Sequence, residues 1–161
     1  MCGNELKAKI KEIIVEYVAN YPTENHTPDI WRTPLVGYAD AREGYIRELQ
    51  EIVIKTHIEP EEILEDANVI ISYFIPFKKE LADTNVGLED NIASKEWAEA
   101  YKITNKMMGQ LSAHLANELN RMGYKAAVPT DAGLLEESLK SNWSQRHVAY
   151  AAGLGTFGIN N

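Results

Sequence analysis

A run of large apolar residues from Val69 to Ile75 constrains the fold of this chain more than any other feature. Val, Ile, Tyr and Phe fill the run, only Ser72 interrupts it, and Pro76 closes it. A short run of this composition, without alternation of apolar and polar residues, is typical of a strand that is buried on both faces. It therefore predicts a sheet with helices on either side.

Helical spacing of apolar residues predicts two helices in the first third of the chain. The first has Asn4 as its N-cap and ends at Tyr21-Pro22. The second begins with an aspartate and a glutamate at capping-box spacing and covers residues 40–53. The stretch between them, residues 22–39, is rich in Thr, Pro and Asn but keeps large side chains. We expect it to form an ordered loop.

Further elements are predicted after these helices. Pro60 opens a short helix with acids in its first turn. Ser94 caps the longest helix, which Gly123 ends and which spans about 40 Å at 1.5 Å per residue. The sequence also predicts a second strand over residues 124–128 and a final helix over residues 144–152.

These elements predict an α/β (α+β) fold in which helices flank a mixed sheet. The 161 residues, 45% of them apolar, suffice for one ordinary hydrophobic core. We expect a single domain over residues 1–161, with a helical part over about residues 1–57 and an α/β core over about residues 58–161.

Charge and hydropathy argue against several classes of function. The chain has 16 basic and 24 acidic side chains and a net charge of −8, which disfavours binding to nucleic-acid backbones. No apolar run approaches the roughly 20 residues that cross a bilayer, and the N-terminus lacks the apolar core of a secretion signal. We therefore expect a cytoplasmic protein with no membrane partner.

Cys2 is the only cysteine. One thiol forms no internal disulfide, no four-cysteine zinc site and no iron-sulfur cluster ligated by this chain alone. We expect no metal site within the chain, and any iron-sulfur cluster that serves it must lie in another domain or chain.

Three glycines near the C-terminus, Gly153, Gly155 and Gly158, have the spacing G-x-G-x-x-G. A dinucleotide-binding loop of this pattern follows a strand, opens a helix and is followed by an acidic residue about 20 positions later. Here the glycines follow a predicted helix, so we reject nucleotide binding. Two interpretations stay open: Gly153 ends the helix and begins a tight turn, or the glycines let a ligand approach the backbone.

The whole segment Trp143–Gly158, W-S-Q-R-H-V-A-Y-A-A-G-L-G-T-F-G, is more specific than its glycines. It resembles the segment of epoxyqueuosine-reductase-like iron-sulfur proteins in which an arginine-bearing helix runs into A-G-L-G-x-x-G. Corrinoid-dependent reductive dehalogenases are similar to it more distantly. Three upstream stretches also look like landmarks of that family: Trp31–Gly37, Ile71–Phe77 and Ser94–Tyr101.

The resemblance implies a nitroreductase-like α/β module that binds cobalamin. In the family, a downstream domain with two four-iron clusters passes electrons to the cobalt. We expect this chain to be a truncated module, with its iron-sulfur half in a missing domain or in a partner chain. The net charge of −8 favours a small substrate over tRNA. The alternative is a non-catalytic relative that binds a partner or forms a homo-oligomer.

The resemblance also implies roles for particular side chains. Asp131 precedes the arginine-bearing helix and is the candidate proton donor, although it is equally suited to a turn after Pro129. Arg146 is expected to anchor an anionic or carbonyl-bearing ligand, or else to pair with Glu136 or Glu137 at the surface.

The remaining candidates lie further along the same segment. Tyr150 is a candidate phenolic donor, with a core position as the alternative. His147 is expected to contact the cofactor, with a structural hydrogen bond as the alternative. The other residues expected to bind the cofactor form the glycine-rich turn: Gly153, Leu154, Gly155 and Gly158. An acid-base hydrolase using Asp131 and His147 is a third reading, without support from spacing.

Overall fold

The computed structural model describes most of the chain and divides it into two compact units. The first unit comprises residues 1–34 and 75–118, and the second comprises residues 35–74 and 119–161. This division leaves the single domain predicted over residues 1–161 as a prediction. The described residues are 3–88, 92–129, 134–135 and 140–158.

The first helix of the first unit, α1 (Gly3–Asn25), extends further than its sequence predicts. Pro22 lies inside it, and Asn4 lies in its first turn and not at an N-cap. Proline removes one hydrogen bond from the helix, and near its end that loss does not stop the following turn from forming. The helix ends where His26 adopts a left-handed φ of 52°.

The longest helix, α6 (Lys95–Arg121), begins and ends as predicted. Ser94 caps it, because its Oγ accepts a hydrogen bond of 3.0 Å from the Trp97 N–H. At the other end Gly123 has a φ of 88° and Tyr124 N–H donates to the Leu119 carbonyl at 3.0 Å. This six-to-one bond with a left-handed glycine is the Schellman ending of a helix.

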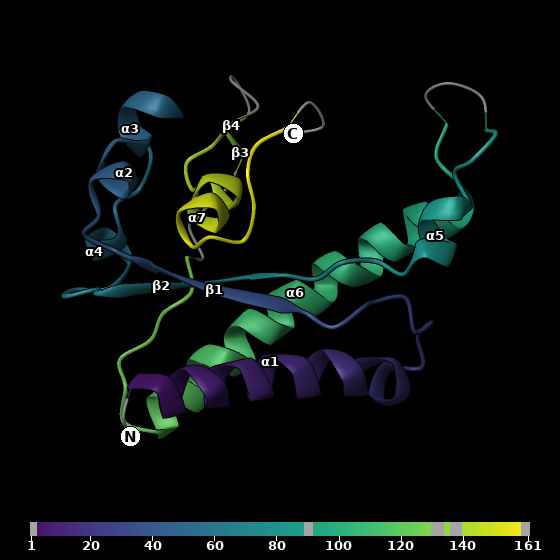
Figure 1. The fold of residues 1–161 in the computed structure, drawn as a ribbon, viewed down its shortest axis with the longest axis horizontal. Coiled ribbons are helices and arrows are strands. Elements are labelled where there is room, and N and C mark those ends of the chain that lie inside the picture. The colour runs from purple at the N-terminus through teal and green to yellow at the C-terminus, as the bar shows by residue number, and fades with distance from the viewer. Residues whose placement is uncertain (1–2, 89–91, 130–133, 136–139, 159–161) are drawn as a thin grey trace. The chain divides into compact units, whose positions relative to one another are not determined.

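α1 and α6 lie side by side (Figure 1), and polar and aromatic side-chain contacts join them. The Tyr21 hydroxyl donates to Gln110 Oε1 at 2.9 Å. One turn earlier in α1, the Tyr17 ring lies 5.0 Å from the His114 ring, which is one turn later in α6. The two helices therefore run antiparallel, and the apolar face of α1 is buried.

The prediction of a loop over residues 22–39 is correct only in its first part. Residues 27–34 form no helix, and Trp31 is buried with its Nε1–H donating to Thr104 Oγ1 at 2.9 Å. The stretch from Leu35 to Asp40 is a strand, β1. Its buried positions carry the small residues Gly37 and Ala39, so it lacks the large apolar side chains that identify strands in a sequence.

The predicted buried strand forms as β2 (Val69–Phe74) and pairs antiparallel with β1. Leu35 lies opposite Phe74, and Asp40 lies opposite Val69. The prediction that β2 is buried on both faces is wrong, because Val69 is 58% exposed and Phe74 is 53% exposed. A two-stranded pair offers less cover than a wide sheet, although α7 (Gln145–Ala151) packs against both strands (Figure 1).

The helix predicted over residues 40–53 forms as two short helices, α2 (Gly44–Arg47) and α3 (Leu49–Ile52). The Asp40 carboxylate does not cap them. It accepts a hydrogen bond of 2.9 Å from the Arg42 N–H instead, and so completes the turn after β1.

Two other predicted elements have opposite outcomes. The short helix at Pro60 is confirmed as α4 (Pro60–Ile63), where the Glu59 N–H donates to Glu62 Oε1 at 3.3 Å. The strand predicted over residues 124–128 is wrong. The Asn120 side chain bonds both backbone groups of Ala126, at 3.0 and 3.1 Å, and so replaces the partner that a ladder would supply.

The described part of the chain therefore combines helices with small antiparallel sheets, and the coarse α+β class is confirmed. The second sheet pairs β3 (Leu134–Leu135) with β4 (Lys140–Ser141). No helix in the described ranges is long and apolar enough to cross a bilayer.

Gly37 is the point at which the end of α7 meets β1. A Cβ atom at Gly37 would lie 2.4 Å from the Ala152 carbonyl oxygen and 2.9 Å from Leu154 Cγ. Real Cβ atoms do not approach backbone so closely, so any side chain here would push the helix end away from the strand.

We expect Gly37→Ala to lower the free energy of unfolding by about 1–3 kcal/mol, because the methyl group would overlap the Ala152 carbonyl. Gly44→Ala is the matched control, since a Cβ at Gly44 meets nothing within 4 Å. Because alanine has a higher helix propensity than glycine, the free energy of unfolding of Gly44→Ala should equal that of the wild type or exceed it by up to about 1 kcal/mol. Urea denaturation measures both, and equal stabilities for the two variants would contradict the close approach.

Candidate functional site

The candidate site is built on α7 and the glycine-rich turn that follows it. Ser144 is the N-cap of α7, and the predicted final helix is thereby confirmed. Gly153 has a φ of 73°, and the Leu154 N–H donates to the Ala149 carbonyl at 3.0 Å. Gly153 therefore ends the helix, as one of the two interpretations of the glycines predicts.

The described residues give no comparable structural reason for glycine at positions 155 and 158. Neither Gly155 nor Gly158 has a positive φ, and a Cβ at either would meet nothing within 4 Å among the described residues. The space beside the Cα atom of each is therefore open among the described residues. Leu154, by contrast, is half-buried with its side chain toward Gly37, which gives it a packing role in this structure.

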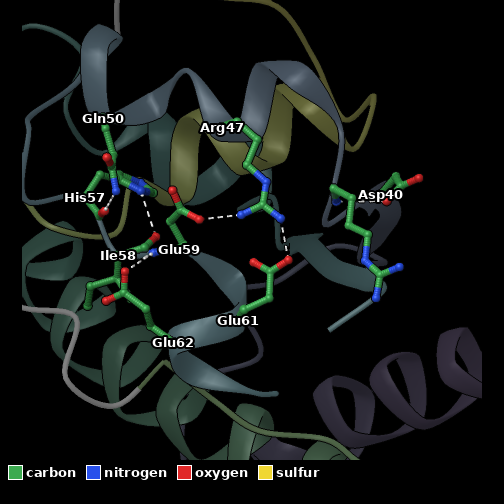
Figure 2. A network of polar contacts seen from close by, with 9 residues as sticks. Asp40, Arg47, Gln50, His57, Ile58, Glu59, Glu61 and Glu62 are labelled. Atoms are coloured by element: carbon green, nitrogen blue, oxygen red, sulfur yellow. Dashed lines mark hydrogen bonds and ion pairs between the residues drawn. The ribbon is translucent and has the colours of Figure 1, made fainter. Parts of the chain in front are cut away.

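His57 belongs to the same unit as α7 but lies far from it in the sequence, and its side chain supports the start of that helix. Its ring stacks on Trp143 at 5.6 Å, and its Nε2 accepts a hydrogen bond of 3.0 Å from the Ser144 N–H. The other ring nitrogen, Nδ1, lies 3.0 Å from the Ile58 carbonyl oxygen (Figure 2). Because a carbonyl only accepts, Nδ1 carries the hydrogen, and because Nε2 accepts the Ser144 N–H, the His57 ring is neutral.

Burial determines how His57 titrates. The side chain is 3% exposed, and this burial lowers the pKa of His57 below its usual value. The hydrogen bond to Ile58 acts in the opposite direction, and nearby His147 lowers the pKa further.

His147 is tied to the same helix start. Its Nδ1 lies 2.6 Å from the Ser144 hydroxyl oxygen, three residues earlier in the chain. Burial lowers the pKa of His147, and the positive charge of Arg146 lowers it further. The imidazole is therefore mainly neutral at pH 7.

Four rings come together beside the glycine-rich turn, and we refer to them as the α7 aromatic patch: Tyr45, His147, Tyr150 and Phe157. Phe157 lies 4.7 Å from His147 and 5.7 Å from Tyr150, measured between ring centroids. Tyr45 lies 5.3 Å from Tyr150. Tyr150 and Phe157 are each 43% exposed, so the patch presents ring surface to solvent.

The structure thus brings together two of the predicted site residues, His147 and Tyr150. Arg146 is on the same helix and exposed. Asp131 lies outside the described residues, as do the proposed alternative partners of Arg146, Glu136 and Glu137.

Three residues of the site were not predicted from the sequence: Tyr45, His57 and Phe157. Phe157 could have been chosen from its place between Gly155 and Gly158. Tyr45 and His57 carry no local signal, because their partners lie many residues later in the chain.

A second polar group joins α2 to α4 and has a structural role. Each terminal nitrogen of Arg47 binds a different carboxylate, one from Glu59 and one from Glu61 (Figure 2). The hydrogen bond to Arg47 lowers the pKa of Glu61, and the same bond raises the pKa of Arg47. Both acids are only about one-third exposed, at 35% for Glu59 and 33% for Glu61. No three His, Cys, Asp or Glu side chains in the described part of the chain form a metal-binding group.

Comparison of the chain with protein-family models, curated proteins and solved structures finds no match. The likeness to epoxyqueuosine-reductase-like proteins therefore rests on the residues of the chain and stays a proposal.

The neutral buried His57 predicts a pH dependence of stability. Unfolding releases the ring to an ordinary pKa of about 6.5, so the unfolded chain binds more protons below that pH. The free energy of unfolding should therefore fall as the pH decreases from about 6.5 toward the lowered pKa of the folded state. Replacing His57 with Gln should make this decline shallower and should cost about 1–3 kcal/mol at pH 7.

Ile58→Val is the matched control, since it removes about 1 kcal/mol of packing but leaves both histidines in place. Urea unfolding of each variant, followed through the NMR signal of the Trp143 indole, reports on the second unit at each pH. The account of His57 is wrong if His57→Gln and Ile58→Val decline with pH at the same rate.

Proposed function

We propose that this chain is the corrinoid-binding module of an iron-sulfur-dependent reductase related to epoxyqueuosine reductase. The observation that carries the proposal is the α7 aromatic patch beside the open backbone of Gly155 and Gly158. The finer fold expected with this function is nitroreductase-like. The sequence W-S-Q-R-H-V-A-Y-A-A-G-L-G-T-F-G supports the same family.

The residues of the site fit a corrinoid in their chemistry. A corrin ring is large and flat, with apolar faces and amide side chains at its edge, so it needs exposed ring surface and accessible backbone groups. Tyr150 and Phe157 supply the ring surface, and Gly155 and Gly158 supply backbone without side chains. The corrin holds its own metal, so the protein does not need to provide a cluster of metal ligands.

When bound, the corrinoid supplies a low-valent metal for reductive cleavage of a carbon-oxygen or carbon-halogen bond. The chain's own residues bind and orient the reactants. Arg146 offers an exposed cation to an anionic or carbonyl group of the substrate. Tyr150 offers a phenolic hydrogen at the patch, and Asp131 is the proposed proton donor by resemblance.

The electrons would come from iron-sulfur clusters in another domain or in a partner chain, since Cys2 is the only cysteine of this chain. The net charge of −8 favours a small-molecule substrate over a nucleic acid. We propose a cytoplasmic location, where such clusters are assembled and reduced.

Exposed apolar residues favour a second candidate, a partner-binding or self-associating protein without catalysis. Besides Tyr150 and Phe157, the cross-strand pair Leu35 and Phe74 is 51% and 53% exposed. Surfaces of this kind are commonly covered by another chain. Under this function, sedimentation would show a concentration-dependent oligomer that Phe157→Ser weakens.

We expect the chain to bind cobalamin and shift its visible spectrum. Gly155→Ala should weaken this binding by at least about fivefold, because the methyl group would occupy the space through which the ring approaches. The same substitution should change the free energy of unfolding by less than about 0.5 kcal/mol, since a Cβ there meets nothing within 4 Å.

Gly109→Ala is the matched control, because it adds the same methyl group at an open position of α6. It should bind cobalamin as the wild type does. A chain that leaves the cobalamin spectrum unchanged, both alone and with an iron-sulfur partner, contradicts the proposed function. Equal binding by Gly155→Ala and the wild type would remove Gly155 from the site.

A further inference from the structure

Ser144 makes two different contacts with two histidines. Its backbone N–H donates to His57 Nε2 at 3.0 Å, and its hydroxyl lies 2.6 Å from His147 Nδ1. His57 comes from the segment between α3 and α4, whereas His147 is on α7 itself. One residue therefore connects a buried histidine to a histidine of the α7 aromatic patch.

The arrangement departs from ordinary helix capping. In a capping box, the N-cap hydroxyl binds the backbone of the third helical residue, and the side chain of that residue returns to bind the N-cap N–H. Here His147 is the third helical residue, the Ser144 hydroxyl makes no capping bond, and His57 takes the Ser144 N–H. The hydroxyl is thereby free to bind the His147 side chain.

The contact between the Ser144 hydroxyl and His147 Nδ1 allows two directions, and they differ in which ring nitrogen of His147 carries the hydrogen. Among the residues that the structure describes, His147 Nδ1 is the recorded hydrogen-bond partner of the Ser144 hydroxyl. A serine hydroxyl has one hydrogen to donate, and a neutral imidazole accepts at one nitrogen only. If the hydroxyl donates to Nδ1, both groups are satisfied and Nε2, on the opposite side of the ring, carries the hydrogen.

We propose that Ser144 is a positioning residue that holds His147 in the Nε2–H tautomer, so that the α7 aromatic patch offers a hydrogen-bond donor to an oxygen acceptor of its ligand. This inference rests on the proposed function for the ligand, which has amide carbonyl oxygens at its edge. The lowered pKa of His147 supports it, because only a neutral ring has a defined tautomer.

The test is the long-range nitrogen-proton NMR spectrum of the histidine rings in the ¹⁵N-labelled chain, recorded above the pKa of a free histidine. The wild type should show His147 with its hydrogen on Nε2 and with Nδ1 shifted by an accepted hydrogen bond. Ser144→Ala should lose that shift and populate both tautomers, and Ser144→Thr should restore the wild-type pattern.

His57 is the control within the same spectra. It binds the backbone N–H of residue 144, which Ser144→Ala retains, so its signals should stay unchanged if the variant is folded. A wild-type His147 with its hydrogen on Nδ1 would overturn the inference. So would a His147 pattern that is the same in Ser144→Ala, with His57 unchanged.

Cobalamin titration separates this inference from the proposed function. Ser144→Ala should weaken binding by about fivefold, the value of one hydrogen bond to a neutral donor, and Ser144→Thr should bind as the wild type does. A wild-type chain that does not bind cobalamin contradicts the proposed function, whereas the NMR spectra alone decide the role of Ser144 in positioning His147.

Discussion

The close approach of the Ala152 carbonyl to Gly37 is the contact on which the second unit depends. The missing Cβ at Gly37 lets the end of α7 lie directly on β1. The left-handed turn at Gly153 then directs the following residues back along α7, where Phe157 meets His147 and Tyr150. A glycine in a strand thus determines where the rings of the candidate site can assemble.

Features encoded by neighbouring residues could be predicted from the sequence. Both ends of α6 and both ends of α7 were predicted correctly. The residues that mark these ends act within one turn of the helix that they begin or end: Ser94 and Gly123 for α6, Ser144 and Gly153 for α7. The strand β1 was not predicted, because its inward positions are Gly37 and Ala39 and its partner residues lie 29 to 39 positions later in the chain. Burial of β2 was overestimated for a related reason, since apolar composition does not reveal how many strands form a sheet.

The candidate site likewise contains residues that local sequence identifies and residues that only the fold brings together. His147 and Tyr150 were predicted from one contiguous segment, and they lie in the same patch. His57 was not, since its contact with Ser144 spans 87 residues and depends on the fold. That contact changes the interpretation of the segment, because the helix start now connects a buried neutral histidine to an exposed cluster of rings. Together with the contact between Ser144 and His147, it leads to the hydrogen-bond donor that we propose for the site.

We propose that the ligand-binding surface of this chain is the α7 aromatic patch with its glycine-rich turn. The most direct measurement is the change in backbone amide NMR signals as cobalamin is added to the ¹⁵N-labelled chain. The account predicts that the largest changes fall on Tyr45, on α7 and on residues 153–158, with α1 and the first half of α6 little affected. Changes centred on α1 and α6, or none at all, would contradict it.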